Sequence, residues 1–239
     1  MTFPVKIVFE GSISKEKLMR NVEKIDFALQ GDDLQMIEIG LNEGERVIAK
    51  AGAFMYMEKG IHFETYVDAK SVKGNGLLAY TNSDVSKRSI AFSAPSGGNI
   101  IPIDLREYNG QIICQSNAFL CAAKVVSINI AFQRKIGFGI FGEKGFAMKN
   151  LKGDGLVYIH ASGAMVKRVL KRGEMLRVDT GCLLAMTSDL DHDIQVIGGI
   201  NNTFNHVEDV YMTSLSGPGT VWLQSTHNTV KNTGAMNLG

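Results

Sequence analysis

The sequence predicts an all-β protein, and three observations support this fold class. From about residue 30 onward, short runs in which polar and apolar residues alternate are separated by glycine turns, which is the pattern of β-strands. The chain has 26 glycines but only 4 prolines, which indicates tight turns rather than disorder. The third observation is a glycine-containing strand motif that occurs three times, at residues 44–57, 110–120 and 173–184.

The repeated motif keeps a nearly constant period. Asn117 of the second copy follows Gly52 of the first by 65 residues, and Gly181 of the third follows 64 residues later. A short apolar run begins directly after each of these positions. Because Gly and Asn both tolerate a left-handed backbone, we expect a structural turn with a positive φ at all three.

A second segment repeats with the same spacing. Residues 146–160 return 64 positions later as residues 210–224, and a weaker first copy lies at 78–93. A Gly-x-Gly turn joins the two apolar runs in the two stronger copies, which is typical of a tight connection between strands. These structural turns contain Gly153 and Gly155 in one copy and Gly217 and Gly219 in the other, whereas the first copy has Lys87-Arg88 there.

The two repeats divide the chain into three tandem β units without a linker. A single unit of this size would be marginally stable, so we expect the three to pack around a shared axis. Residues 15–25 carry apolar side chains at helical spacing after Ser12 or Ser14, which predicts one short N-terminal helix. The expected parts are an extension at 1–23, units at 24–93, 94–160 and 161–225, and a C-terminal tail at 226–239.

Composition excludes several function classes. The 25 Lys and Arg nearly balance the 24 Asp and Glu, so the net charge of +1 gives no overall attraction to nucleic acid, and binding would need a local patch. The 3 cysteines lie in apolar alternating runs at spacings that suit neither a zinc site nor a disulfide framework. With no secretory signal and no long apolar run, we expect a cytoplasmic protein.

Four blocks of this sequence resemble a known family. They are Gly44-Glu45-x-Val47-x-Ala49-x-Ala51-Gly52-Ala53, Phe141-Gly142-Glu143-x-Gly145-Phe146, Gly173-Glu174-x-Leu176-x-Val178-Asp179-Thr180-Gly181 and Gly217-Pro218-Gly219-x-Val221-Trp222-Leu223-Gln224-Ser225. Over residues 24–226 and in this order, they resemble the mitochondrial biogenesis family named for altered inheritance of mitochondria, formerly a bacterial domain of unknown function.

The resemblance implies a fold similar to the trp RNA-binding attenuation protein, with three tandem β-rolls of the double-stranded β-helix kind and pseudo-threefold symmetry. It implies little about chemistry, because the bacterial members have no agreed activity and the mitochondrial ones are tied to inner-membrane organisation. This sequence departs from the family pattern at residues 205–209, which replace a third Gly-Glu-Gly loop, and in its N-terminal extension.

A glycine-rich loop at residues 137–142 spells the dinucleotide fingerprint GxGxxG. That fingerprint needs a helix after the loop, whose N-terminus holds the pyrophosphate, but the residues that follow are strand-like. The sequence therefore predicts no nucleotide cofactor here. Phe138 and Phe141 in this loop are instead a candidate contact with a partner or a membrane surface.

Double-stranded β-helix proteins often hold a metal through His-x-His, a carboxylate and a later His, and no His-x-His occurs here. His62 and Glu64 would share one face of a strand, and residues 189–193 gather three aspartates around His192. The Asp-rich segment also fits a solvated turn. We expect no metal and no catalytic residue.

Two further sites receive weak support. Ser162 could share a strand face with His160, but no acid is placed to complete a catalytic triad. Single-stranded RNA readers combine basic grooves with stacking aromatics. The basic clusters here are short: Lys167-Arg168 with Lys171-Arg172, and Arg134-Lys135.

The function predicted is that of a non-enzymatic scaffold or interaction protein that forms a homo-oligomer or binds a protein or membrane surface, because exposed β edges must be covered. The alternative from a different class is a small-molecule-binding or cupin-like metal-dependent enzyme that uses the interior of a roll. The third is single-stranded RNA binding by analogy of fold, which is a weak basis for function.

Overall fold

The computed structural model describes residues 26–32, 34–67, 76–95, 97–123, 126–134, 146–197 and 210–226. Over these residues the protein is all-β, with several antiparallel sheets, two short 3-10 helices and no α-helix. The fold class predicted from the sequence is confirmed at this level. The predicted N-terminal helix and the tail beyond residue 226 lie outside the described residues.

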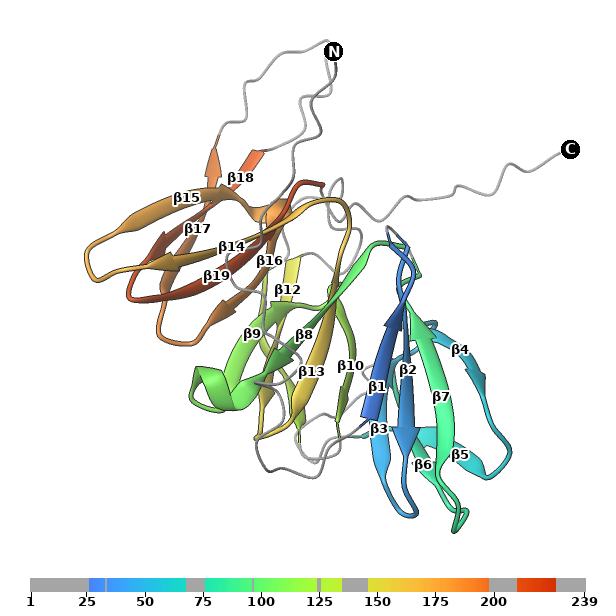
Figure 1. Cartoon of the computed structure of the whole chain (residues 1–239). Helices are drawn as coiled ribbons and strands as arrows, with labels where there is room; N and C mark the ends of the chain where they lie inside the picture. The colour runs from blue at the N-terminus through green and yellow to red at the C-terminus, as the bar shows by residue number, and fades with distance from the viewer. Residues whose placement is uncertain are drawn as a thin grey trace, which may run out of the picture.

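Short strands follow one another along the described chain (Figure 1). They are β1 (Asp26–Gln30), β2 (Met36–Leu41), β3 (Arg46–Lys50), β4 (Phe54–Met57), β5 (Ile61–Thr65), β6 (Leu77–Asn82), β7 (Arg88–Ser93), β8 (Asn99–Asp104), β9 (Gln111–Gln115), β10 (Phe119–Ala123), β11 (Ser127–Arg134), β12 (Phe146–Lys152), β13 (Leu156–Ala161), β14 (Met165–Leu170), β15 (Met175–Asp179), β16 (Leu183–Thr187), β17 (Asp191–Ile197), β18 (Val210–Ser216) and β19 (Gly219–Gln224). The 3-10 helices are η2 (Leu105–Tyr108) and η3 (Thr180–Cys182).

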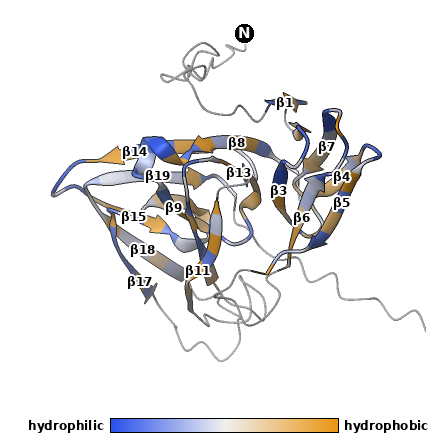
Figure 2. Cartoon of the chain, turned by 90° about the horizontal axis from the view of Figure 1, so that it is seen from below, coloured by the Kyte–Doolittle hydropathy of each residue, from blue (hydrophilic) through white to orange (hydrophobic). Residues whose placement is uncertain are grey.

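The strands form four sheets. Sheet A has the order β1-β2-β7-β4, sheet B β5-β6-β3-β10-β13-β8, sheet C β11-β12-β9-β16-β19-β14 and sheet D β15-β18-β17. Sheets A and D lie at opposite ends of the molecule, with the two six-stranded sheets between them, in both of two perpendicular views (Figures 1 and 2). Each six-stranded sheet therefore has neighbours on both of its faces.

Three hydrophobic cores fill the spaces between these sheets, as expected for strands that bury both faces. The first core contains Ile37 and Phe92 of sheet A and Tyr158 of sheet B. The other two cores follow in order along the molecule. The central core contains Ile48, Val157 and Phe119 of sheet B with Ile112 of sheet C, and the third contains Met148 and Leu183 of sheet C with Leu215 of sheet D.

One irregularity recurs in three strand pairs. The register shifts by one residue in β4 against β7, in β10 against β13 and in β16 against β19. The shifts lie between Phe54 and Tyr56, between Phe119 and Cys121, and between Leu183 and Ala185. A bulge bends its strand locally. Each bulge lies at the start of its strand, directly after the corner at which the chain leaves β3, β9 or β15 and enters a different sheet.

The predicted positive φ at these corners is right at one position and wrong at two. Gly52 has a φ of +86°, but Asn117 and Gly181 do not have positive φ values. Ala53 N donates to Lys50 O and Ala118 N to Gln115 O, so both turns close over the same span, but only the first uses a left-handed residue.

The third corner uses a different device. Gly181 lies in η3, and its N–H donates to the carboxylate of Asp179 at 2.7 Å. This side-chain cap closes the turn without a left-handed residue. Sequence alone showed that a corner was needed, but not which of several turn types would form it.

A recurrent left-handed glycine does exist seven or eight residues earlier in the motif. Gly44, Gly110 and Gly173 have φ values of +73°, +73° and +84°. The glutamate that follows the first and third of them also has a structural role. Glu45 Oε2 accepts a hydrogen bond from Asn42 N at 2.7 Å, and Glu174 Oε2 accepts one from Lys171 N at 2.8 Å. The Gly-Glu pair therefore closes the turns before β3 and β15.

The Gly-x-Gly connections lie where the second repeat predicted them. Gly153 and Gly155 lie between β12 and β13, and Gly217 precedes Gly219 at the start of β19. An added Cβ at Gly217 would lie 2.3 Å from Lys171 O, so the backbones are too close for a side chain.

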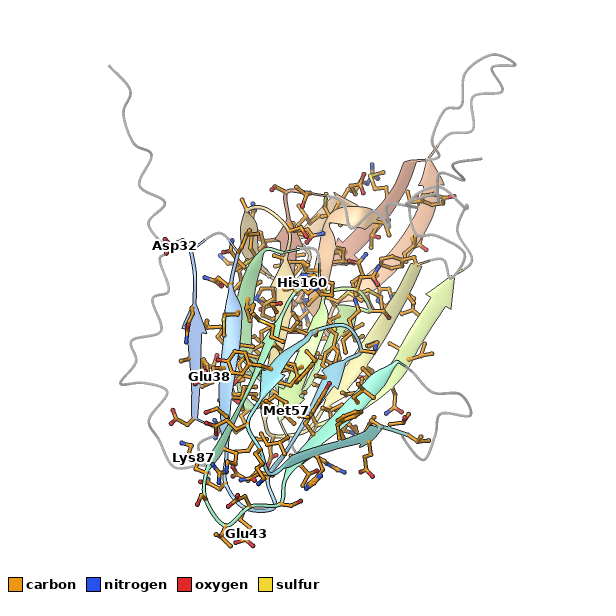
Figure 3. All side chains as sticks on the ribbon, turned by 90° about the vertical axis from the view of Figure 1, so that its right-hand side faces the viewer. Asp32, Glu38, Glu43, Met57, Lys87 and His160 are labelled. Carbon is orange, nitrogen blue, oxygen red and sulfur yellow. The ribbon has the colours of Figure 1, made fainter. Side chains whose placement is uncertain are left out.

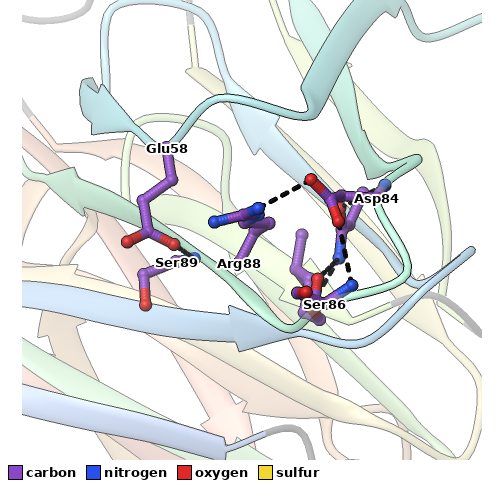
Figure 4. A network of polar contacts seen from close by, with 7 residues as sticks. Glu58, Asp84, Ser86, Arg88 and Ser89 are labelled. Carbon is purple, nitrogen blue, oxygen red and sulfur yellow. Dashed lines mark hydrogen bonds and ion pairs between the residues drawn. The ribbon is translucent and has the colours of Figure 1, made fainter.

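The first unit makes the corresponding connection differently, with side chains in place of glycines (Figure 4). Asp84 accepts from Arg88 Nη2 at 2.7 Å and from Ser86 N at 2.9 Å. Asn82 Nδ2 donates to Leu41 O and to Ser86 O. This polar network therefore holds the β6–β7 turn in the copy that lacks the Gly-x-Gly sequence.

Substitutions at the first two corners should change the free energy of unfolding in a predictable direction. Gly52→Ala should lower the free energy of unfolding by about 1 kcal/mol, because alanine resists a positive φ. Asn117→Gly should also be destabilising, by roughly 0.5–1 kcal/mol, because glycine there only adds entropy to the unfolded chain. Urea unfolding measures both values, and a stabilised Asn117→Gly variant would show that Asn117 is left-handed in solution.

Candidate functional site

The histidines weighed as candidate metal ligands in the sequence are not brought together. His62 and Glu64 are exposed on β5, at the edge of sheet B, whereas His192 lies on β17, at the edge of sheet D. His192 stacks on Phe132, with ring centroids 4.9 Å apart. The loop with Phe138 and Phe141 lies outside the described residues.

Two of the aspartates around His192 accept hydrogen bonds from amide side chains. Asp193 Oδ2 accepts from Gln195 Nε2 at 2.8 Å, and Asp189 Oδ2 accepts from Asn109 Nδ2 at 3.4 Å. Among the described residues, no group of three or more His, Cys, Asp or Glu side chains is arranged to hold a metal ion. The segment behaves as the polar turn and strand end that its composition also fitted.

A polar cluster that contains a buried histidine lies at the corner between β9 and β10 and joins the first two units. We call it the corner cluster, and it consists of Lys50, Asn117 and His160. The Asn117 carbonyl oxygen lies 2.7 Å from His160 Nε2 and accepts a hydrogen bond from Lys50 Nζ at 3.3 Å. Figure 3 labels His160 among the strands in the interior of the molecule.

Burial decides the protonation state of the corner cluster. Desolvation lowers the pKa of His160, the hydrogen bond to Asn117 opposes this and the positive charge of Lys50 adds to it, so that the pKa falls to about 4. Desolvation also lowers the pKa of Lys50. A neutral imidazole that bonds to the Asn117 carbonyl must donate from Nε2–H, which leaves Nδ1 as the unprotonated nitrogen.

The corner cluster has a structural role, in which side chains hold the Asn117 carbonyl by hydrogen bonds. His160 Nδ1 is buried and has no hydrogen-bond partner among the described residues. It is not hydrogen-bonded to Ser162, whose own N–H donates to Gln224 Oε1 at 3.1 Å. At the equivalent corner of the third unit, Gln224 Nε2 donates to Gly181 O at 3.5 Å, so the same carbonyl is held by a side chain with no acid-base role.

In the basic cluster on β14, Lys167 contacts aromatic side chains of the same chain. Lys167 Nζ donates to the Tyr108 hydroxyl at 2.8 Å and lies over the rings of Tyr108 and Trp222. A ring covered by a lysine of the same chain does not offer that face to a nucleic-acid base. Arg168 is exposed on the same strand, and the side chains of Arg134-Lys135 lie outside the described part of the chain.

The structural feature that sequence reasoning missed is an apolar strand edge. β4 forms one end of sheet A, and we call its outer side the β4 edge (Phe54–Met57). Phe54, Met55 and Tyr56 are 41%, 45% and 42% exposed. Three consecutive large exposed apolar residues on a strand at the end of a sheet are unusual for a protein that acts alone.

Equivalent residues in the other two units are fully buried. Leu120 and Leu184 occupy the position of Met55, and both are 0% exposed. Cys121 and Ala185 occupy the position of Tyr56 and are also 0% exposed. In those units a neighbouring strand covers them, β3 beside β10 and β9 beside β16. The signal was present in the sequence as three aligned apolar runs, but exposure depends on which strand lies alongside.

Side-chain contacts hold the β4 edge in place. The Tyr56 hydroxyl donates to the carboxylate of Glu38 on β2, and this bond raises the pKa of Tyr56. Glu58 Oε2 accepts from Ser89 N at 2.7 Å at the end of β4 (Figure 4). Figure 3 looks onto this end of the molecule, with Glu38 and Met57 labelled. The edge is therefore a positioned strand rather than a loose segment.

A second open edge lies at the far end of the molecule. β15 ends sheet D, and we call its outer side the β15 edge (Met175–Asp179). Met175 is 64% exposed, and Arg177 is also exposed. Within the described part of the chain, no strand pairs with the outer side of β15 or of β4. The described residues also contain no helix that is long and apolar enough to span a membrane.

His160 should make stability fall in acid. Its pKa is lowered when folded and ordinary when unfolded, so the unfolded chain binds more protons between pH 6.5 and about 4. The free energy of unfolding should therefore decrease as pH falls through this window, by on the order of 3 kcal/mol in full. Urea unfolding at pH 7 and 4.5 measures the loss.

His160→Gln should remove most of that dependence, because glutamine can donate to the Asn117 carbonyl without titrating. The matched control is His62→Gln, on the exposed β5 strand, which should leave the pH dependence unchanged. Equal slopes for wild type and His160→Gln would contradict the assignment.

Comparison with known proteins identifies the family. Residues 27–226 match the family described as Mitochondrial biogenesis AIM24. An uncharacterised protein of Streptococcus pyogenes serotype M6 is 24% identical over 206 residues, which cover 80% of this chain and 81% of that protein. A crystal structure of another S. pyogenes protein has a TM-score of 0.70 at 19% identity, and the match covers 84% of this chain and 94% of that one.

The structural match supports the fold alone, because its sequence identity is low. The family match covers most of the chain, from β1 to the end of β19, and it agrees with the resemblance found in the four sequence blocks. The chain belongs to the mitochondrial biogenesis AIM24 family.

Proposed function

We propose that this protein is a non-enzymatic scaffold that self-associates. The observation that carries the proposal is the β4 edge, where a well-positioned strand exposes three large apolar side chains whose equivalents are buried in the other two units. Removal of such side chains from water contributes about 25 cal/mol per Å² of apolar surface, before the costs of association are subtracted. An exposed apolar edge of this kind is therefore a surface for a partner.

The repeat supports the same proposal. We interpret the chain as three tandem β-rolls, β2–β7, β8–β13 and β14–β19, because the strand order and the bulge recur in each. The pairings β3–β10 and β9–β16 join successive units in the same way. In this proposal the units follow one another by a repeated step, which leaves one side of the first and last units open, and they do not close around the shared pseudo-threefold axis that the sequence led us to expect.

The interiors of the three units support a structural rather than an enzymatic role. The hydrophobic cores contain large, fully buried apolar side chains, such as Phe92, Phe119 and Phe146, as expected of packed cores rather than of a polar-lined ligand cavity. The buried thiols of Cys114 and Cys121 are unpaired, which supports our expectation of a reducing, cytoplasmic environment.

Sedimentation of the purified full-length chain tests the proposal. Between about 1 and 100 μM we expect the weight-average mass to rise above that of the monomer, because standard-sized interfaces have dissociation constants from μM down to pM. Phe54→Ser with Met55→Ser should shift the distribution towards monomer.

The matched control for that double variant is Val166→Ser with Val169→Ser. Both valines are exposed on β14, away from the β4 edge, and their replacement should leave the mass unchanged. A protein that stays strictly monomeric over this concentration range would contradict the proposed self-association.

A further inference from the structure

We infer that two copies of this chain associate head to tail, with the β4 edge of one copy pairing with the β15 edge of the other. The inference rests on the proposed self-association and specifies its partner, its strands and its register. It follows from a comparison of the two junctions within the chain with the two strands that lack a neighbour.

Strand order gives the first argument. Sheet B reads β5-β6-β3 followed by β10-β13-β8, and sheet C reads β11-β12-β9 followed by β16-β19-β14. Each six-stranded sheet therefore joins a half from one unit to a half from the next. The remaining halves are β17-β18-β15 in sheet D and β4-β7-β2 in sheet A. Joined through β15 and β4, they complete the same six-stranded order, with β1 added at its end.

Register gives the second argument. At the first junction Cys121, Ala122 and Ala123 face Ala49, Ile48 and Val47, and at the second Ala185, Met186 and Thr187 face Cys114, Ile113 and Ile112. These two sets coincide when shifted by the repeat spacing. The same register at the third junction pairs Tyr56 with Val178, Met57 with Arg177 and Glu58 with Leu176.

Burial gives the third argument. Leu120 and Cys121 of β10 reach into the first core, and Leu184 and Ala185 of β16 reach into the central core. Each pair thus fills the core of the preceding unit. By the same geometry, Met55 and Tyr56 of one copy reach the third core of its neighbour, beside Val178. Leu176 of that core is only partly buried in the single chain.

Arg177 should weaken the contact and so keep it reversible. Its equivalents are Ile48, which is 1% exposed, and Ile113, which packs against the third core. A charge on an edge strand costs desolvation when a partner covers it, and native proteins use such charges to limit edge-to-edge growth. On β3 and β9 the equivalent position is an isoleucine. Among the residues of the β15 edge, only Arg177 replaces an apolar residue of both internal junctions by a charged one.

The register is tested by disulfide formation between two variants. In a background with the half-exposed Cys182 changed to serine, one chain carries Met57→Cys and the other Arg177→Cys. Directly opposed residues of antiparallel strands have Cα atoms about 4.5–5.5 Å apart, within the range for a disulfide. Mild oxidation of the mixture should give a covalent dimer, and neither variant alone should.

The matched control keeps the strand and the strand face but changes the register. Met175→Cys lies two residues from Arg177 on β15, and its mixture with Met57→Cys should cross-link at least about tenfold more slowly, because diagonal neighbours are about 7–8 Å apart. Dimers from either single variant, or equal rates with Met175→Cys, would overturn the head-to-tail register even if the protein self-associates by sedimentation.

A second variant acts in the opposite direction and does not rely on cysteine. Arg177→Ile restores the residue present at both internal junctions and should tighten self-association by about tenfold in sedimentation, the effect of about 1.4 kcal/mol. The control is Arg168→Ile on the exposed β14 strand, which should have no effect. Unchanged association of Arg177→Ile would overturn the edge pairing. A wild-type protein that does not self-associate at all would instead overturn the proposed function itself.

Discussion

The structure depends on one interaction, the sharing of a sheet between two successive units. β3 pairs with β10 and β9 with β16, so no unit buries its core alone. Because side chains alternate between faces, one such strand supplies Val47 to the first core and Ile48 to the central core. Cutting between units would expose both faces of a sheet at once. This explains why the chain has no linker between units and why its three cores follow one another without a break.

The same interaction explains the distribution of polar and apolar residues at the ends of the molecule. Where a strand continues the sheet, its outer positions carry residues such as Leu120, Leu184 or Ile48, and these are buried. Where the sheet stops, β4 keeps the apolar residues and β15 keeps most of them but adds Arg177. If both strands only faced solvent, we would expect polar or charged residues in place of these apolar ones on both.

The sequence predicted the all-β class and the family well, because both depend on local patterns such as strand alternation and the Gly-Glu turn. It failed where the answer depends on distant neighbours. The turn at Asn117 closes without a positive φ, and η3 closes the corner at Gly181 with a side-chain cap. The candidate site was likewise hidden, since the apolar run at 53–57 looks the same as those at 118–122 and 182–186 until strand pairing shows that only one lacks a neighbour.

Hydrogen exchange of the wild-type protein at several concentrations tests the central claim most directly, because edge amides exchange with solvent unless a strand covers them. We expect amides of β4 and β15 to become protected together as concentration rises, while those of the exposed edge strand β14 do not change. Fast exchange of β4 and β15 at every concentration, or protection of only one of them, would contradict the account.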